Sequence, residues 1–92
     1  MKVTVRYSAQ AREASGRASE TLDLEEPHTV RDLIVRLARQ HGSAFRRLAL
    51  GADGTPHPSL LVAVGDEQVR PNDLRVLRAG DVVSILSPIG GG

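Results

Sequence analysis

The last six residues, Ser87-Pro88-Ile89-Gly90-Gly91-Gly92, have the clearest potential for chemistry. Proline cannot donate to a β-ladder and glycine has no Cβ, so the stretch predicts a thin, flexible tail that leaves a folded body. Such a tail could enter a channel too narrow for side chains and present the α-carboxylate of Gly92 to another protein. A carboxylate is a poor electrophile, but ATP can convert it to an acyl-adenylate that a sulfur nucleophile then attacks. We therefore predict that Gly92 is the reacting residue and that the catalytic groups belong to a partner.

The rest of the composition offers no competing chemistry. The chain has no cysteine, so it lacks a thiol nucleophile and a thiolate ligand. The spacing of His28, His41 and His57 fits no metal motif, and we expect no metal site. Ninety-two residues make one domain that is too small to enclose a deep cleft. We expect no bound cofactor, because any ATP and Mg²⁺ would be used by the activating partner.

Charge and apolar content exclude several classes of partner. The formal net charge is +1, which gives no overall field toward nucleic acid or anionic lipid. Tyr7 and Phe45 are the only aromatic residues, so the chain has no stacking platform for single strands. No apolar run reaches the length of a signal peptide or the roughly 20 residues of a membrane span. We expect a cytoplasmic protein that binds neither nucleic acid nor a membrane.

The tail must be positioned by the elements that precede it. Alternating apolar residues predict strands over residues 2–7 and 20–25, joined by a polar connection over 9–16. Apolar residues at helical spacing predict a helix over 30–41. Thr29 and Asp32 form its expected capping box, and Gly42 follows its last turn. A second, short helix is expected over 43–50.

The second half of the chain predicts three more strands. They cover residues 60–64, 67–70 and 82–86, with a loop over 51–58 and a turn at 65–66. The last strand is the most apolar, so we expect it inside the sheet and parallel to the first strand. One main helix covers one face of a mixed sheet of about five strands. This is an α+β fold of the β-grasp, or ubiquitin-like, type, with the domain over 1–86 and the tail over 87–92.

Three segments carry a resemblance to a known family. They are VRYSAQAREASG (5–16), VAVGDEQV (62–69) and LRAGDVVSILSPIGGG (77–92). They resemble the small subunit of molybdopterin synthase and the sulfur carriers of the thiamine and cysteine pathways. The resemblance implies a sulfur carrier, not an enzyme, whose Gly92 is adenylated by an E1-like adenylyltransferase. A sulfurtransferase or another sulfur donor then makes the thiocarboxylate, and a synthase accepts the sulfur.

The resemblance also implies which residues meet the partners. Gly91 and Gly92 match the family's diglycine, and Pro88, Ile89 and Gly90 would enter the partner with them. Relatives pack an apolar patch of the sheet against their partners, and Leu86 and Tyr7 could serve here. Arg12 could contact an acidic group of a partner.

Several functional alternatives stay open. The sulfur acceptor could be a pterin, a thiazole, an activated serine, a tRNA base or a specialised metabolite. Ser8 and Gln68 stand near positions that are more apolar in the molybdopterin subunit, and residues 45–61 form a longer segment, as in the cysteine-pathway carriers. Gly92 could instead form isopeptide bonds as a protein modifier, or the domain could only bind. A run of glycines can also be a frayed end or a linker.

Overall fold

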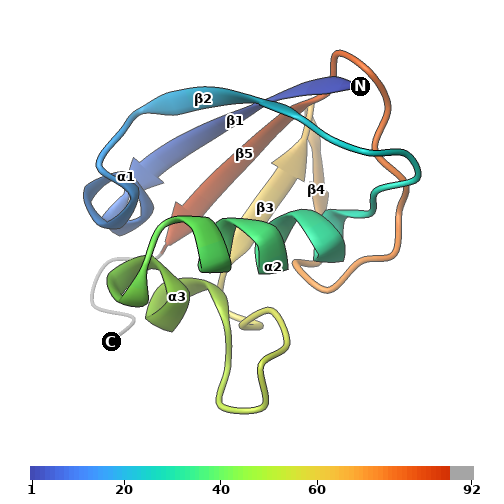
Figure 1. Ribbon diagram of the computed structural model, residues 1–92. Coiled ribbons are helices and arrows are strands. Elements are labelled where there is room, and N and C mark those ends of the chain that lie inside the picture. Colours follow the sequence, from blue (N-terminus) through green and yellow to red (C-terminus); the bar gives the residue numbers. More distant parts are fainter. Residues whose placement is uncertain (88–92) are drawn as a thin grey trace.

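The structure is a computed structural model of the chain, and it describes residues 1–87. A single five-stranded sheet has the order β2-β1-β5-β3-β4 (Figure 1). The strands are β1 (Lys2–Ala9), β2 (Ser19–Asp23), β3 (Leu61–Val64), β4 (Glu67–Val69) and β5 (Val82–Ser87). The helices are α1 (Gln10–Ser15), α2 (Val30–Gln40) and α3 (Ser43–Ala49).

Strand β5 lies inside the sheet, as the sequence predicts. It pairs in parallel with β1, where Val5 lies opposite Val83, and antiparallel with β3, where Val62 lies opposite Ile85. Strand β2 pairs antiparallel with the other edge of β1, and β4 closes a hairpin with β3. The two ends of the domain are therefore joined side by side at the centre of the sheet.

Helix α2 forms as its sequence pattern predicts. The Thr29 hydroxyl accepts a hydrogen bond from the Asp32 N–H at 3.0 Å, and the Asp32 carboxylate accepts one from the Thr29 N–H at 3.1 Å. This capping box satisfies two amides that have no partner within the helix. Gly42 follows the C-cap residue with a φ of 86°, a left-handed conformation that suits glycine.

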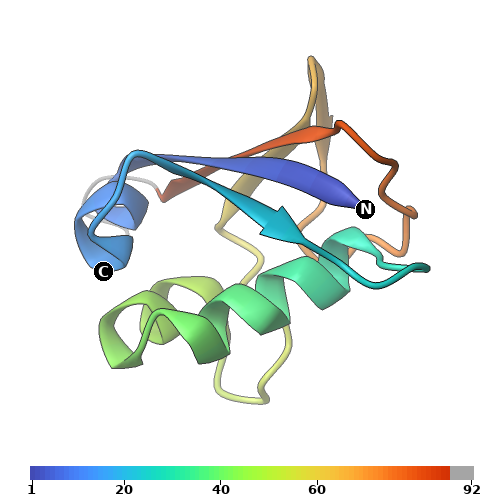
Figure 2. The same ribbon diagram turned by 45° about the horizontal axis from the view of Figure 1, so that its top comes forward.

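The core fills the space between the sheet and the helices. Helices α2 and α3 lie on one face of the sheet, and the opposite face has no helix over it (Figure 2). The apolar stripe of α2 is fully buried against the inward side chains of the strands, and Phe45 and Ala49 of α3 complete the core. The inner face of the sheet therefore builds the fold, while the outer face stays open to solvent.

Helix α1 was not predicted. Residues 10–15 read as a polar connection, yet they form a short helix because Ala11 is fully buried. Gly16 ends the helix with a φ of 77°, and its N–H donates to the carbonyl of Arg12 at 3.0 Å. A single buried alanine in six residues gives too little periodicity to indicate a helix.

Strand bounds differ from the predicted ones in two places that matter for the site. Strand β3 begins at Leu61, one residue after its predicted start. Its side chains alternate between the outer and inner faces of the sheet, so Leu61 is exposed although residues 60–64 are a continuous apolar run. Strand β5 continues to Ser87, one residue beyond its predicted end. Ser87 lies opposite Ala9 in the ladder and is buried, so it belongs to the sheet. Within residues 1–87, no helix is long and apolar enough to cross a membrane.

Candidate functional site

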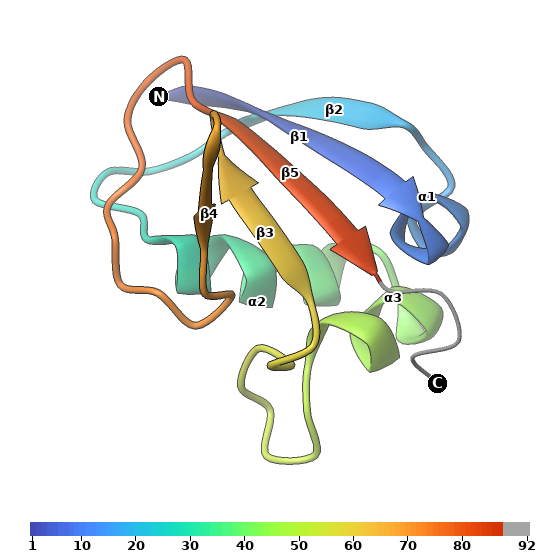
Figure 3. The ribbon, with the colours of Figure 1, turned by 180° about the vertical axis from the view of Figure 1, so that it is seen from behind.

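The candidate site begins where β5 ends. The predicted contact residues Pro88, Ile89, Gly90 and Gly91, together with Gly92, lie outside the described residues. Their attachment point is Ser87, the last residue of a strand that has a hydrogen-bonded neighbour on each side (Figure 3). The sheet therefore fixes the place from which the predicted tail starts.

An exposed apolar patch lies next to this point on the outer face of the sheet. Leu61 and Leu86 lie directly opposite each other in the β3–β5 ladder, and they are 39% and 38% exposed. Ala63 continues the patch along β3. Ser8, Ser84 and Gln68 border a shallow depression around it. We call Leu61, Ala63 and Leu86 the outer patch. Its contiguity supports docking of a partner better than scattered apolar residues would.

Tyr7 does not belong to this patch. It lies opposite Ile85 in the ladder, on the inner face, and only 3% of its surface is exposed. Its ring packs edge-on against Phe45, with the ring centroids 5.7 Å apart. Tyr7 and Leu86 therefore do not share a surface, and of the two only Leu86 is accessible to a partner in this state.

Tyr7 instead takes part in a buried polar cluster with Glu20 and His41. The Tyr7 hydroxyl donates to Glu20 Oε2 at 2.6 Å, and His41 Nε2 lies 2.6 Å from the same oxygen. Gln40 donates to the other carboxylate oxygen at 3.1 Å. The Glu20 and His41 side chains are each 6% exposed. The cluster ties β1 and β2 to the end of α2, beneath the sheet.

The electrostatics of the cluster favour a carboxylate at Glu20. Burial raises the pKa of Glu20. The hydrogen bonds with Tyr7 and His41 and the charges of His41 and Arg17 lower it by more than burial raises it, so the pKa lies below the ordinary value. Burial and the neighbouring Glu20 carboxylate raise the pKa of Tyr7, which keeps its hydroxyl a donor. Sequence reasoning missed this cluster, although Glu20 shares the inward alternation of Leu22 and an inward acid requires a partner.

Arg12 is exposed on α1, as a role in partner contact requires. Helix α1 follows the end of β1 and packs against β1, β5 and α3. Within residues 1–87, Arg12 has no carboxylate within ion-pair distance. Arg12 therefore lies exposed on a helix that packs beside β5, where it is available to an acidic group of another protein.

The backbone is strained at Ala9, the last residue of β1 and the N-cap of α1, which has φ 54° and ψ −131°. This conformation costs a residue with a Cβ about 1–3 kcal/mol. We expect Ala9→Gly to raise the free energy of unfolding by about 1 kcal/mol, because relief of strain outweighs the extra freedom of glycine in the unfolded chain. Urea denaturation measures the change. Ala14→Gly, in the adjoining helix α1, is the control and should destabilise by about 0.5–1 kcal/mol. An unchanged or lower value for Ala9→Gly contradicts the prediction.

The described residues contain no metal-binding cluster. Within 1–87, no three histidine or acidic side chains lie close enough together to hold an ion. His41 belongs to the buried polar cluster. The Ser59 N–H donates to His57 Nδ1 at 3.1 Å, and the Ser59 hydroxyl oxygen lies 2.7 Å from the same nitrogen.

Solved structures share this fold over the whole chain. SAMP1 from Haloferax volcanii superposes with a TM-score of 0.86 at 23% identity and covers 100% of both chains. A putative molybdopterin converting factor subunit 1 from Pyrococcus furiosus has a TM-score of 0.76 at 29% identity and covers 97% of this chain and 99% of its own. Mycobacterium tuberculosis CysO has a TM-score of 0.66 at 24% identity, with 95% and 99% covered. The fold is the predicted ubiquitin-like β-grasp.

Sequence comparison identifies the family. The ThiS family model matches residues 5–92. The molybdopterin synthase sulfur carrier subunit of Chlamydomonas reinhardtii is 28% identical over 92 residues, which are 100% of both chains. The protein belongs to the ThiS family of ubiquitin-like sulfur carriers. It is a carrier protein rather than an enzyme, as the sequence predicts.

Proposed function

We propose that this protein carries sulfur as a thiocarboxylate on Gly92. The observation that carries the proposal is the family match, which extends through the glycines to residue 92. In the first step, a carboxylate oxygen of Gly92 attacks the α-phosphorus of ATP on an E1-like enzyme, and pyrophosphate leaves. In the second step, a sulfur nucleophile from a donor attacks the acyl carbon, and AMP leaves. When the donor is a persulfide, a thiol of the partner attacks the donor's own sulfur and forms a disulfide with it, and the thiocarboxylate is the leaving group.

The described residues supply recognition rather than catalysis in this scheme. Leu61 and Leu86 offer apolar area beside the end of β5, and Arg12 offers a cation on the adjacent helix. An activating enzyme that docks on the outer patch would find the predicted tail at the rim of its contact. ATP and Mg²⁺ are bound by that enzyme, and the carrier contributes the acyl group.

The same surface is expected to serve the sulfur-accepting synthase. A pterin acceptor has the most direct support, because the full-length relative from Chlamydomonas is a molybdopterin synthase sulfur carrier subunit. This relation suggests a large synthase subunit as the final partner. The likeness to CysO keeps a cysteine pathway among the acceptors to be tested.

Intact-mass measurement tests the proposal. The chain is co-expressed with the E1-like enzyme and a sulfurtransferase of its own genome, then purified. Replacement of one terminal oxygen by sulfur should add about 16 Da, and iodoacetamide should alkylate the new thiocarboxylate. An unshifted mass together with adducts on lysines of other proteins would instead support the modifier. An unshifted mass without adducts would support a binding module.

A further inference from the structure

A second exposed surface lies away from the outer patch. It consists of the solvent face of α2 and residues 70–78, which belong to the connection from β4 to β5 and pass the start of α2 (Figure 1). Within the described residues, the two most exposed large apolar side chains lie here. Leu74 is 67% exposed and Val76 is 52% exposed, more than either leucine of the outer patch. We call this region the α2 surface.

The apolar residues of the α2 surface are held in place by the helix. The amides of Val30 and Arg31 donate to the carbonyls of Arg75 and Asp73, each at 3.0 Å. These are amides of the first helical turn, which have no partner inside the helix. The amide of Leu77 donates to the carbonyl of His28 at 2.8 Å, and the Leu77 side chain is buried. The segment that bears the exposed side chains is therefore pre-organised for binding.

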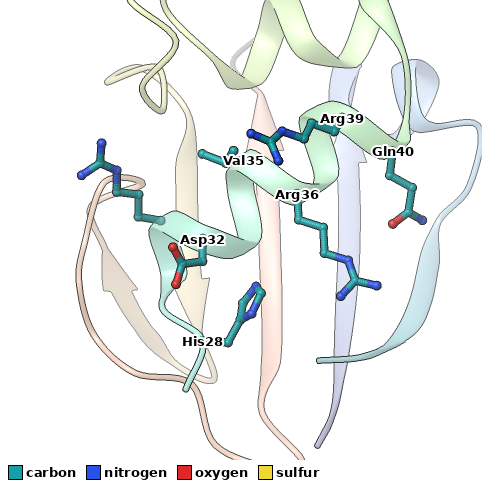
Figure 4. A pocket seen from close by; sticks show the side chains of 7 residues that line it. His28, Asp32, Val35, Arg36, Arg39 and Gln40 are labelled. Atoms are coloured by element: carbon teal, nitrogen blue, oxygen red, sulfur yellow. The ribbon is translucent and has the colours of Figure 1, made fainter. Parts of the chain in front are cut away.

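The α2 surface is strongly basic. Residues 28–40 and 70–78 contain six arginines and two aspartates, a net charge of +4 in a chain of net charge +1, so the other residues sum to −3. Both aspartates already accept backbone hydrogen bonds. Arg75 pairs with Glu67 Oε1 at 2.9 Å, but no carboxylate within residues 1–87 lies within ion-pair distance of Arg31, Arg36 or Arg39. Figure 4 shows Arg36 and Arg39 extending from the solvent face of α2 around Val35.

We propose that the α2 surface docks an acidic surface of a second protein that carries apolar side chains at its centre. Exposed leucine and valine beside arginine match the composition of protein interfaces. Contacts to a nucleic-acid backbone are polar and would leave Leu74 and Val76 without a partner. The overall charge of +1 hides this asymmetry, because the basic face is balanced by acids elsewhere. The inference goes beyond the sulfur chemistry and does not depend on Gly92.

Backbone amide shifts of the ¹⁵N-labelled full chain test the proposal. The probe is a short synthetic peptide that alternates glutamate with leucine, and its matched form has serine in place of leucine. The leucine peptide should shift amides of residues 28–40 and 70–78 and leave those of 61–63 and 84–86 in place. Leu74→Ser with Val76→Ser should raise the dissociation constant about tenfold, and Arg31→Glu with Arg39→Glu at least as much. Leu61→Ser with Leu86→Ser, on the outer patch, is the control that should bind unchanged.

Four results would overturn the inference. Equal affinity for the leucine and serine peptides would mean that charge attraction alone causes the binding and that the exposed apolar side chains do not contribute. Tighter binding of a short RNA duplex than of the leucine peptide would assign the surface to nucleic acid. A concentration-dependent dimer that Leu74→Ser dissolves would assign it to a second copy of the chain. Amide shifts confined to the outer patch would show that the leucine peptide binds there and not at the α2 surface. All variants alter exposed side chains, and their unfolding transitions check that they remain folded.

Discussion

Addition of one alanine after Gly92 is expected to abolish thiocarboxylate formation, with a loss of at least about 100-fold. The extra residue moves the carboxylate one position along the chain. It also brings a Cβ into the partner's channel, which we predict to be too narrow for side chains. Intact mass after incubation with the E1-like enzyme, ATP and the sulfur donor measures the product. Binding of the enzyme to the outer patch should persist.

Gly90→Ala is the matched control for this experiment, because it adds a single methyl group two residues before Gly92 and leaves the last two glycines unchanged. It should keep most of the product, whereas Gly91→Val should lose most of it. A chain with the added alanine that still gains about 16 Da would show that the reaction does not require glycine at the terminal carboxylate. Loss of product in Gly90→Ala, with unfolding unchanged, would show that a third glycine is required here.

Glu20→Ala is expected to lower the free energy of unfolding by about 3 kcal/mol, a large share of the 5–15 kcal/mol typical of a domain. The substitution leaves the Tyr7 hydroxyl and the His41 ring in the core without the oxygen that both contact. Urea denaturation at pH 7 measures the loss. Glu25→Ala, an exposed acid just after β2, is the control and should change stability by less than about 0.5 kcal/mol. Equal effects of the two substitutions would contradict a clamping role for Glu20.

The same carboxylate should make stability depend on acid pH. The pKa of Glu20 is lowered in the folded state, so the unfolded chain takes up its proton first as the pH falls. The contribution of Glu20 to the stability of the fold is complete at a pH above its ordinary pKa of 4.5. It is lost as the pH falls through the lower pKa of the folded state. Asp32 behaves likewise, because the Thr29 amide and hydroxyl lower its pKa. When the free energy of unfolding is measured against pH, Glu20→Gln should therefore remove only part of its fall in acid. An unchanged fall would contradict a lowered pKa at Glu20.

The sequence predicts the fold well where one residue pattern decides the outcome. The alternation of apolar residues in β1 predicts a strand, and the capping box at Thr29 predicts the start of the main helix. The apolar run of β5 predicts a central strand parallel to β1. Helix α1 depends on burial of Ala11 among three other elements, which no local pattern reveals. The alternation of Val3, Val5 and Tyr7 already indicated an inward Tyr7, so its assignment to a docking patch conflicted with the pattern itself.

The candidate sites were less predictable because they join distant parts of the chain. The outer patch depends on the register that places Leu61 opposite Leu86, and register follows from tertiary pairing. The buried polar cluster brings together residues 7, 20 and 41 from three elements. The α2 surface depends on residues 73–77 lying along the start of α2, which total charge cannot indicate.

The central position of β5 has a mechanical consequence. A partner that draws in the chain beyond Ser87 applies its force along β5, which is held by six residue pairs with β1 and four with β3. Load along the strand axis shears these ladders together, whereas an edge strand pulled sideways would unzip one rung at a time. We therefore expect the domain to stay folded when a partner applies force at this end of the chain.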